Sequence, residues 1–143
     1  MGLVMIYLKN MLLKSYFAIE CLQERYYRSS WELWCWSWSN GFGFPIRSDF
    51  ATVDVDGHHF FLTHGHLFDE DNLPGLNDGD IFVYGHIHKP VAKEINGIYI
   101  INPSSISLPK EGKNSYGIYE KDTFMIKDFD QTVVKKIDFR KSQ

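Results

Sequence analysis

Apolar and polar positions follow a strand-like pattern from residue 44 onward. In ATVDVDGHHFFLTHG, the runs Ala51–Val55 and Phe60–Thr63 flank an Asp-Gly dipeptide, whose glycine tolerates the positive φ of a tight turn. The same arrangement recurs where Val91–Ile95 and Ile98–Ile101 flank an Asn-Gly dipeptide. Each arrangement predicts a β-hairpin.

Further strands are predicted around these hairpins. Ile81–Tyr84 is a short, wholly apolar run, which is typical of a buried strand. Apolar and polar residues alternate, or β-branched residues occur, in two further segments, SYGIYEKDTFMIKDF and VVKKIDF. Both segments predict additional strands nearer the C-terminus. We therefore expect residues 44–143 to form a β-rich part of an α/β domain, without internal repeats.

Residues 1–43 have a different pattern. The start, MGLVMIYLKNMLLKSYFAIECL, is apolar, but Lys9, Asn10 and Lys14 interrupt every run long enough to span lipid. We expect an amphipathic helix there instead of a signal peptide or anchor. All four tryptophans fall in WELWCWSW, residues 31–38. That segment could be a poorly patterned core segment or an aromatic patch for a membrane surface or a sugar.

Composition narrows the class of protein. A chain of 143 residues can bury one hydrophobic core. Its net charge is −3 and it has no basic tract, so no positively charged surface is expected to bind a nucleic-acid backbone. The two cysteines are not spaced like metal ligands and fit a reducing compartment. We expect a cytoplasmic protein.

Two His-x-His pairs follow predicted strands. His64 and His66 lie in FLTHGH, and His86 and His88 lie in VYGHIH. A strand fixes the backbone, and the following loop can turn imidazoles toward a common point, so the pairs indicate a metal site. Three of these histidines could also make a single zinc site.

The remaining candidate features of this region are simpler. Gly65 and Gly85 are expected to ease the turns that follow the two strands. His58 and His59 lie beside the first predicted hairpin turn, and we interpret them as hydrogen-bonded residues that do not bind metal.

The strings FLTHGHLF, NLPGLNDGDIFVYGHIHKPV and INPSSISLPK together resemble the second half of the calcineurin-like metallophosphoesterases, specifically the small YfcE-type phosphodiesterases. The resemblance implies the C-terminal portion of an α/β sandwich. It also implies that His64 and His86 bind one metal and His88 binds a second. His66 would contact the substrate phosphate or orient a metal ligand. Asn102 and Ser104 would form a supporting turn in which Ser104 replaces the family's glycine.

The same resemblance implies a reaction. Two divalent ions, expected to be Mn²⁺, would activate a water for hydrolysis of a small phosphodiester, and no protein nucleophile would be needed. The family's first half contributes an Asp-x-His, a Gly-Asp and a Gly-Asn-Cys-Asp motif, and none of these occurs in residues 1–43. We therefore expect the N-terminal half to be missing or out of frame, and the chain to be impaired as an enzyme.

The tryptophan-rich segment suggests how the motif was lost. Back-translation of WELWCWSWSNG, with TGA read as tryptophan, gives Gly-Asn-Cys-Asp-Val-Glu-Val-Asp-Gln-Met in the shifted frame. The two frames rejoin at Phe44, so we interpret residues 1–43 as an atypical segment that is out of frame and residues 44–143 as the C-terminal part of the domain.

Two rival functions remain. The fold also occurs in a retromer subunit that acts chiefly as a scaffold, so a non-catalytic interaction module is the main alternative. A single-zinc hydrolase, which would not need the missing carboxylates, is the other. In every case, loss of the first half should expose an apolar sheet face, so we expect self-association or a complementing N-terminal polypeptide, with no membrane partner.

Overall fold

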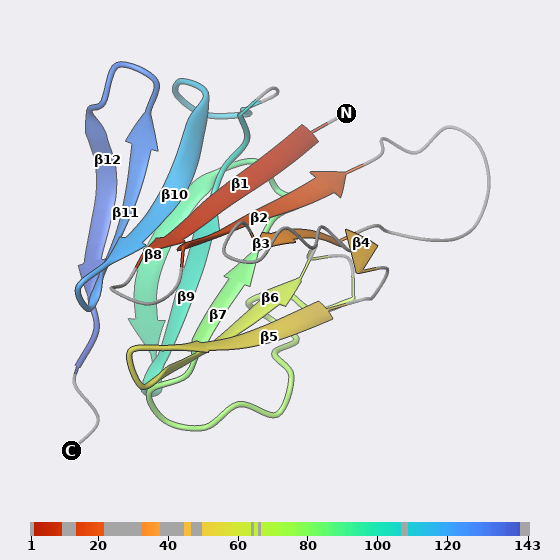
Figure 1. The fold of residues 1–143 in the computed structure, drawn as a ribbon, viewed down its shortest axis with the longest axis vertical. Coiled ribbons are helices and arrows are strands. Elements are labelled where there is room, and N and C mark those ends of the chain that lie inside the picture. Colours follow the sequence, from red (N-terminus) through yellow and green to blue (C-terminus); the bar gives the residue numbers. More distant parts are fainter. Residues whose placement is uncertain are drawn as a thin grey trace.

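The chain folds into two β-sheets that share a core (Figure 1). The computed structural model describes residues 2–9, 14–21, 33–37, 45–46, 50–63, 65, 67–106 and 109–140. Before residue 50 it describes the strand backbone and the side chain of Ile6. The described residues contain no helix. The β-rich character predicted from the sequence is confirmed.

The five-stranded sheet contains the predicted first hairpin, the buried strand and the second hairpin. Its order is β5-β6-β7-β9-β8. The three central strands, β6, β7 and β9, run parallel, and β5 and β8 flank them as antiparallel edges. The strands are β5 (Phe50–Val55), β6 (His58–Thr63), β7 (Ile81–Tyr84), β8 (Pro90–Ile95) and β9 (Ile98–Pro103).

The turn chemistry explains both hairpins of this sheet. The central residues have φ values of 53° and 79° at Asp56 and Gly57, and of 51° and 80° at Asn96 and Gly97. A two-residue turn with positive φ at both positions matches the twist of the flanking strands, and Asp, Asn and Gly tolerate that conformation best. Both hairpin predictions are confirmed.

The seven-stranded sheet has the order β12-β11-β10-β1-β2-β3-β4. Its C-terminal strands, β10 (Ser115–Glu120), β11 (Thr123–Asp128) and β12 (Val133–Asp138), are those predicted from the sequence. The other four strands are β1 (Gly2–Lys9), β2 (Lys14–Cys21), β3 (Leu33–Ser37) and β4 (Pro45–Ile46). β1 pairs with β10 in parallel, and the remaining neighbours are antiparallel.

The expected N-terminal helix was wrong. The segment forms the hairpin β1–β2, in which Gly2 pairs with Cys21 and Lys9 with Lys14. Lys9 and Lys14, two of the polar residues that interrupt the apolar run, end β1 and begin β2. Because β10 and β2 satisfy the two edges of β1, tertiary pairing overrides the local preference of this segment.

Side chains of the five-stranded sheet alternate between two apolar layers. Between the sheets, Phe60, Leu62 and Val83 pack with Ile6, Tyr119 and Phe124 of the seven-stranded sheet. On the outer face, a second cluster contains Phe61, Phe82, Tyr84 and Ile100, and it is covered by Phe68, Leu73, Leu76 and Ile87 among others. The loop that connects β6 to β7 supplies the first three of these covering residues.

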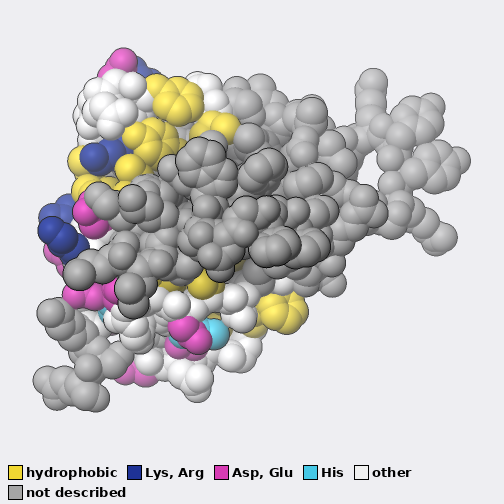
Figure 2. Space-filling model, in the orientation of Figure 1, with side chains coloured by type: hydrophobic (Ala, Val, Ile, Leu, Met, Phe, Trp, Pro, Cys, Tyr) yellow, Lys and Arg dark blue, Asp and Glu magenta, His cyan; other side chains and the backbone are white. Residues whose placement is uncertain are grey.

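The expectation of a bare apolar sheet face was wrong for the five-stranded sheet. The seven-stranded sheet covers one face and the β6–β7 loop covers the other. Hydrophobic side chains do reach the surface over the β10–β12 side of the molecule (Figure 2). The large apolar side chains that are exposed among the described residues are Phe50, Leu67, Ile95, Phe129, Val133 and Val134.

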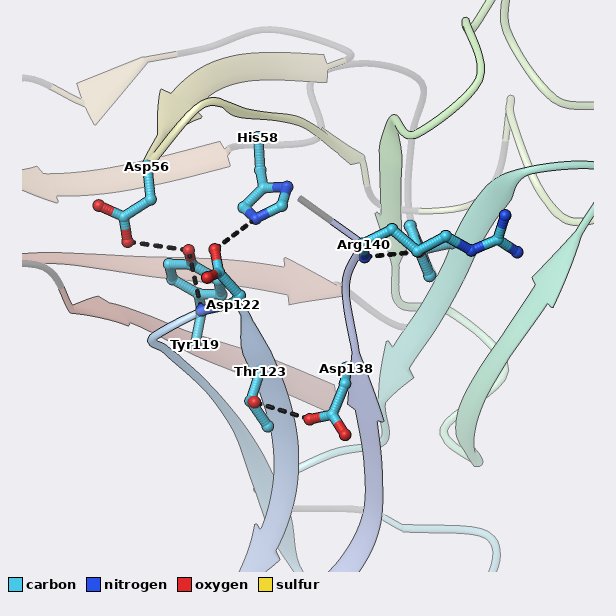
Figure 3. Close-up of polar contacts among 8 residues, drawn as sticks. Asp56, His58, Tyr119, Asp122, Thr123, Asp138 and Arg140 are labelled. Carbon is cyan, nitrogen blue, oxygen red and sulfur yellow. Dashed lines mark hydrogen bonds and ion pairs between the residues drawn. The ribbon is translucent and has the colours of Figure 1, made fainter. Parts of the chain in front are cut away.

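A polar cluster joins the turns of the two sheets (Figure 3). The buried His58 places Nε2 2.7 Å from Asp122 Oδ1, and the Tyr119 hydroxyl donates to Asp56 Oδ2 over 2.8 Å. His59 Nδ1 lies 2.6 Å from Asp54 Oδ1 at the surface. Both histidines are therefore hydrogen-bonded residues, as predicted.

Within the part of the chain that the structure describes, no helix is long and apolar enough to cross a membrane.

Candidate metal centre

Three motifs follow the ends of three parallel strands. Thr63, the last residue of β6, pairs with Tyr84, the last residue of β7, and β7 pairs in parallel with β9. The carboxyl ends of β6, β7 and β9 therefore meet at one edge of the sheet, where ligands commonly bind in open sheets with parallel strands. The Thr-His-Gly-His, Gly-His-Ile-His and Asn-Pro-Ser-Ser motifs begin at or beside this edge.

The loop after β7 has an unusual backbone. His86 is exposed and His88 is buried, and their φ values are 65° and 54°. A tight turn centred on His86 follows the strand, because the Ile87 N–H donates to the Gly85 carbonyl over 2.8 Å. Gly85 itself does not have a positive φ. The expectation that this glycine eases the turn was wrong, since the two histidines take the left-handed conformation instead.

Gly65, which belongs to the Thr-His-Gly-His motif, lies against the Gly-His-Ile-His motif. Its φ is 106°, as a glycine that eases a turn requires. A Cβ atom at this position would lie 3.2 Å from the Gly85 carbonyl oxygen, from the His86 Cβ and from the Tyr84 ring. The Gly65 backbone therefore packs directly against Gly85 and His86.

The turn after β9 bonds to the same loop. The Asn102 amide donates to the Gly85 carbonyl over 2.8 Å, and its Oδ1 accepts the Ser104 N–H over 2.9 Å. The Ser104 hydroxyl donates to the His88 carbonyl over 3.0 Å. Asn102 and Ser104 are almost fully buried, and Ser104 has a φ of 64° where the family turn has glycine.

Tyr84 lies beneath the loop, in the apolar layer. Burial, and secondarily the Glu70 carboxylate, raise the pKa of its phenol to about 12, while the Asn102 amide opposes the shift. Its hydroxyl oxygen is buried without a hydrogen bond of good geometry to any described group. Tyr84 is therefore neutral at physiological pH, and it stacks on Phe82 with ring centroids 5.4 Å apart.

Three contacts of this region were not anticipated from the sequence. They are the approach of Gly65 to His86, the Tyr84 ring beneath the loop, and the backbone bond from the Lys110 N–H to the His88 carbonyl at 2.9 Å. The first of these depends on the parallel pairing of β6 with β7, which no local sequence signal gives.

His64, a predicted metal ligand, and His66, the predicted substrate contact, lie outside the described residues. In the described ranges, no three His, Cys, Asp or Glu side chains are arranged to hold a metal ion. The described donors are the imidazoles of His86 and His88. Two neutral imidazoles do not fit a pair of dications, which require oxygen ligands with negative charge.

The fold and the motifs define the class of protein. Residues 40–123 match the calcineurin-like phosphoesterase superfamily domain, and this match covers more than half of the chain. The chain belongs to this superfamily.

Particular relatives refine the placement. The chain is 42% identical to the phosphodiesterase YfcE of Escherichia coli strain K12 over 96 residues, which are 66% of this chain and 52% of the relative. It is 38% identical to the phosphodiesterase MJ0936 of Methanocaldococcus jannaschii over 61 residues, covering 41% of this chain and 36% of the relative.

Solved structures agree with this placement. The structure of E. coli YfcE, a phosphoesterase, superposes with a TM-score of 0.65 and 40% identity, over 68% of this chain and 54% of that one. A predicted phosphoesterase from Streptococcus pneumoniae gives a TM-score of 0.50 at 23% identity, over 70% of this chain and 67% of that one, and shows the shared fold alone. The α/β fold class is thus established, and the chain spans about half the length of the curated relatives it matches.

Proposed function

We propose that this chain carries one part of a metal-dependent phosphodiesterase site and is impaired as an enzyme by itself. The observation that carries the proposal is the meeting of three family motifs at the carboxyl ends of β6, β7 and β9. In this assignment His64 and His86 bind one divalent ion, His88 binds another, and His66 contacts the substrate phosphate.

The donor chemistry supports a site to which this chain contributes only some of the metal ligands. Two divalent ions, with Mn²⁺ preferred, would neutralise phosphate charge and activate a water. The described residues offer imidazoles at this edge, and the family's bridging carboxylate is absent from residues 1–43. We infer that a complementing N-terminal polypeptide or a corrected reading frame supplies the remaining ligands. We also infer a small phosphodiester substrate and a cytoplasmic location.

The test measures hydrolysis of bis(p-nitrophenyl) phosphate with Mn²⁺ by the purified chain, alone and mixed with the first half of E. coli YfcE. We expect no turnover alone, turnover in the mixture, and loss of that turnover in the His86→Ala variant. His59→Ala is the matched control, because His59 is partly exposed and pairs with Asp54. Robust turnover by the chain alone would contradict the impairment, and an inactive mixture would contradict the proposed site.

A scaffold function is the second candidate, supported by the incomplete donor set. Metal titration separates the two. Tight binding of Mn²⁺ by the mixture supports the enzyme, whereas a mixture that binds no metal supports the scaffold.

A further inference from the structure

The carbonyl group of His88 accepts two hydrogen bonds from segments that are distant in the sequence. The Ser104 hydroxyl donates from the turn after β9 over 3.0 Å, and the Lys110 N–H donates over 2.9 Å. Ser104 and the His88 residue are both buried. The backbone of His88 is therefore held by two segments besides its own loop.

Both partners in this contact have strained backbones. His88 has a φ of 54° and Ser104 a φ of 64°, and residues with a Cβ adopt this region only when the surroundings hold them there. Glycine would remove the strain at position 104. A glycine, however, would have no hydroxyl to donate to His88.

We propose that Ser104 is a positioning residue, whose hydroxyl holds His88 in the left-handed conformation and so sets the direction of its imidazole. The proposal deepens the proposed function, since it takes His88 as a metal ligand. Asn102 acts with it from the same turn, because its amide fixes the Gly85 carbonyl at the other end of the loop.

Two variants separate the hydroxyl from the strain. Ser104→Ala removes the hydroxyl and keeps the Cβ, whereas Ser104→Gly removes the hydroxyl and also relieves the backbone. Ser115→Ala is the matched control. Ser115 is equally buried, and its hydroxyl donates over 2.9 Å to the carbonyl of Pro103, the residue before Ser104. This variant therefore loses the same kind of bond to the same turn, while the bond from Ser104 to His88 is kept.

The first readout is amide hydrogen exchange of Lys110, whose N–H reports on the His88 carbonyl and needs no metal. Both Ser104 variants should exchange this proton roughly three- to tenfold faster, which corresponds to the loss of one hydrogen bond, and Ser115→Ala should leave it close to the wild-type rate. The positioning role is overturned if neither Ser104 variant changes the rate, or if Ser115→Ala changes it as much.

The second readout is Mn²⁺ affinity, measured in the mixture with the YfcE half. We expect several-fold weaker binding by Ser104→Gly, although its thermal stability is kept, and unchanged binding by Ser115→Ala. Equal affinity in wild type and Ser104→Gly overturns the inference. If the wild-type mixture binds no Mn²⁺, the proposed function fails, and the exchange experiment still decides whether Ser104 positions His88.

Discussion

At the scale of single residues, the approach of Gly65 to the second histidine loop limits what position 65 can hold. In Gly65→Ala the new Cβ would have a positive φ and three contacts at 3.2 Å, one of them to a backbone oxygen. We expect a loss of about 1–3 kcal/mol in the free energy of unfolding, measured with urea.

Gly79→Ala is the matched control for that substitution. Gly79 has a φ of 89°, and a Cβ there would meet nothing within 4 Å, so only the backbone strain is added. Equal losses in the two variants would show that contact with the His86 loop contributes nothing.

Tyr119 gives a prediction for alkaline pH. Burial, and then the hydrogen bond to Asp56, raise the pKa of its phenol above the usual value of 10.0. The folded state therefore holds this proton more tightly than the unfolded state, and the stabilisation is present below pH 10 and lost as the pH rises above it. Between pH 9 and 11 the advantage of wild type over Tyr119→Phe should shrink by about 1 kcal/mol in urea unfolding. A constant difference would contradict the shift.

Residue-scale features were only partly predictable. Strain at Ser104 could be anticipated, because the serine stands where the family motif has glycine, and the φ of 64° agrees. The positive φ values of His86 and His88 could not be anticipated. The adjacent Gly85 offered a residue better suited to that conformation, and Gly85 instead contacts Gly65 and accepts a hydrogen bond from Asn102, both distant in the sequence.

At the scale of elements, the polar cluster between the β5–β6 and β10–β11 turns connects the two sheets. His58→Ala removes the buried partner of Asp122 and should lower the free energy of unfolding by about 1–3 kcal/mol. His59→Ala removes the hydrogen bond to Asp54, which has a similar length of 2.6 Å. This bond lies at the surface and joins neighbouring strands of one sheet. Its loss should cost less than about 0.5 kcal/mol. Equal losses in urea unfolding would mean that the cluster does not fasten the sheets.

The elements that could be predicted are those that local chemistry specifies. Asp-Gly and Asn-Gly turns fix two hairpins, and short apolar runs fix the strands between and after them. The N-terminal hairpin was mistaken for a helix, because an apolar run with three polar interruptions fits both the helical and the strand repeat of apolar residues. The deciding interaction is the parallel pairing of β1 with β10, more than 100 positions away in the sequence.

At the scale of the whole molecule, the site depends on which segments reach one sheet edge. The described part of the chain brings two of the three motifs there in full, with Thr63 and Gly65 of the third. The motif histidines were recognisable in the sequence because clustered imidazoles have few structural uses, whereas the meeting of β6, β7 and β9 required the parallel order of the sheet. The chain spans about half the length of the curated relatives it matches. Under the proposed function, the remaining ligands come from a second polypeptide or from a corrected reading frame.

The reading-frame hypothesis makes the most decisive prediction for the whole molecule. We expect that replacing residues 31–43 by Gly-Asn-Cys-Asp-Val-Glu-Val-Asp-Gln-Met-Val-Leu-Asp strengthens Mn²⁺ binding by about tenfold or more, because the segment gains amide and carboxylate oxygens, which suit Mn²⁺. Turnover should stay low, since Asp-x-His and Gly-Asp remain absent from residues 1–30. A scrambled order of the same residues controls for charge alone, and His86→Ala in the replaced chain should remove the gain. If the scrambled segment binds as tightly, the motif is not part of the site. If the coding nucleotides lack this motif in the shifted frame, the tryptophans of residues 31–38 did not arise by frameshift.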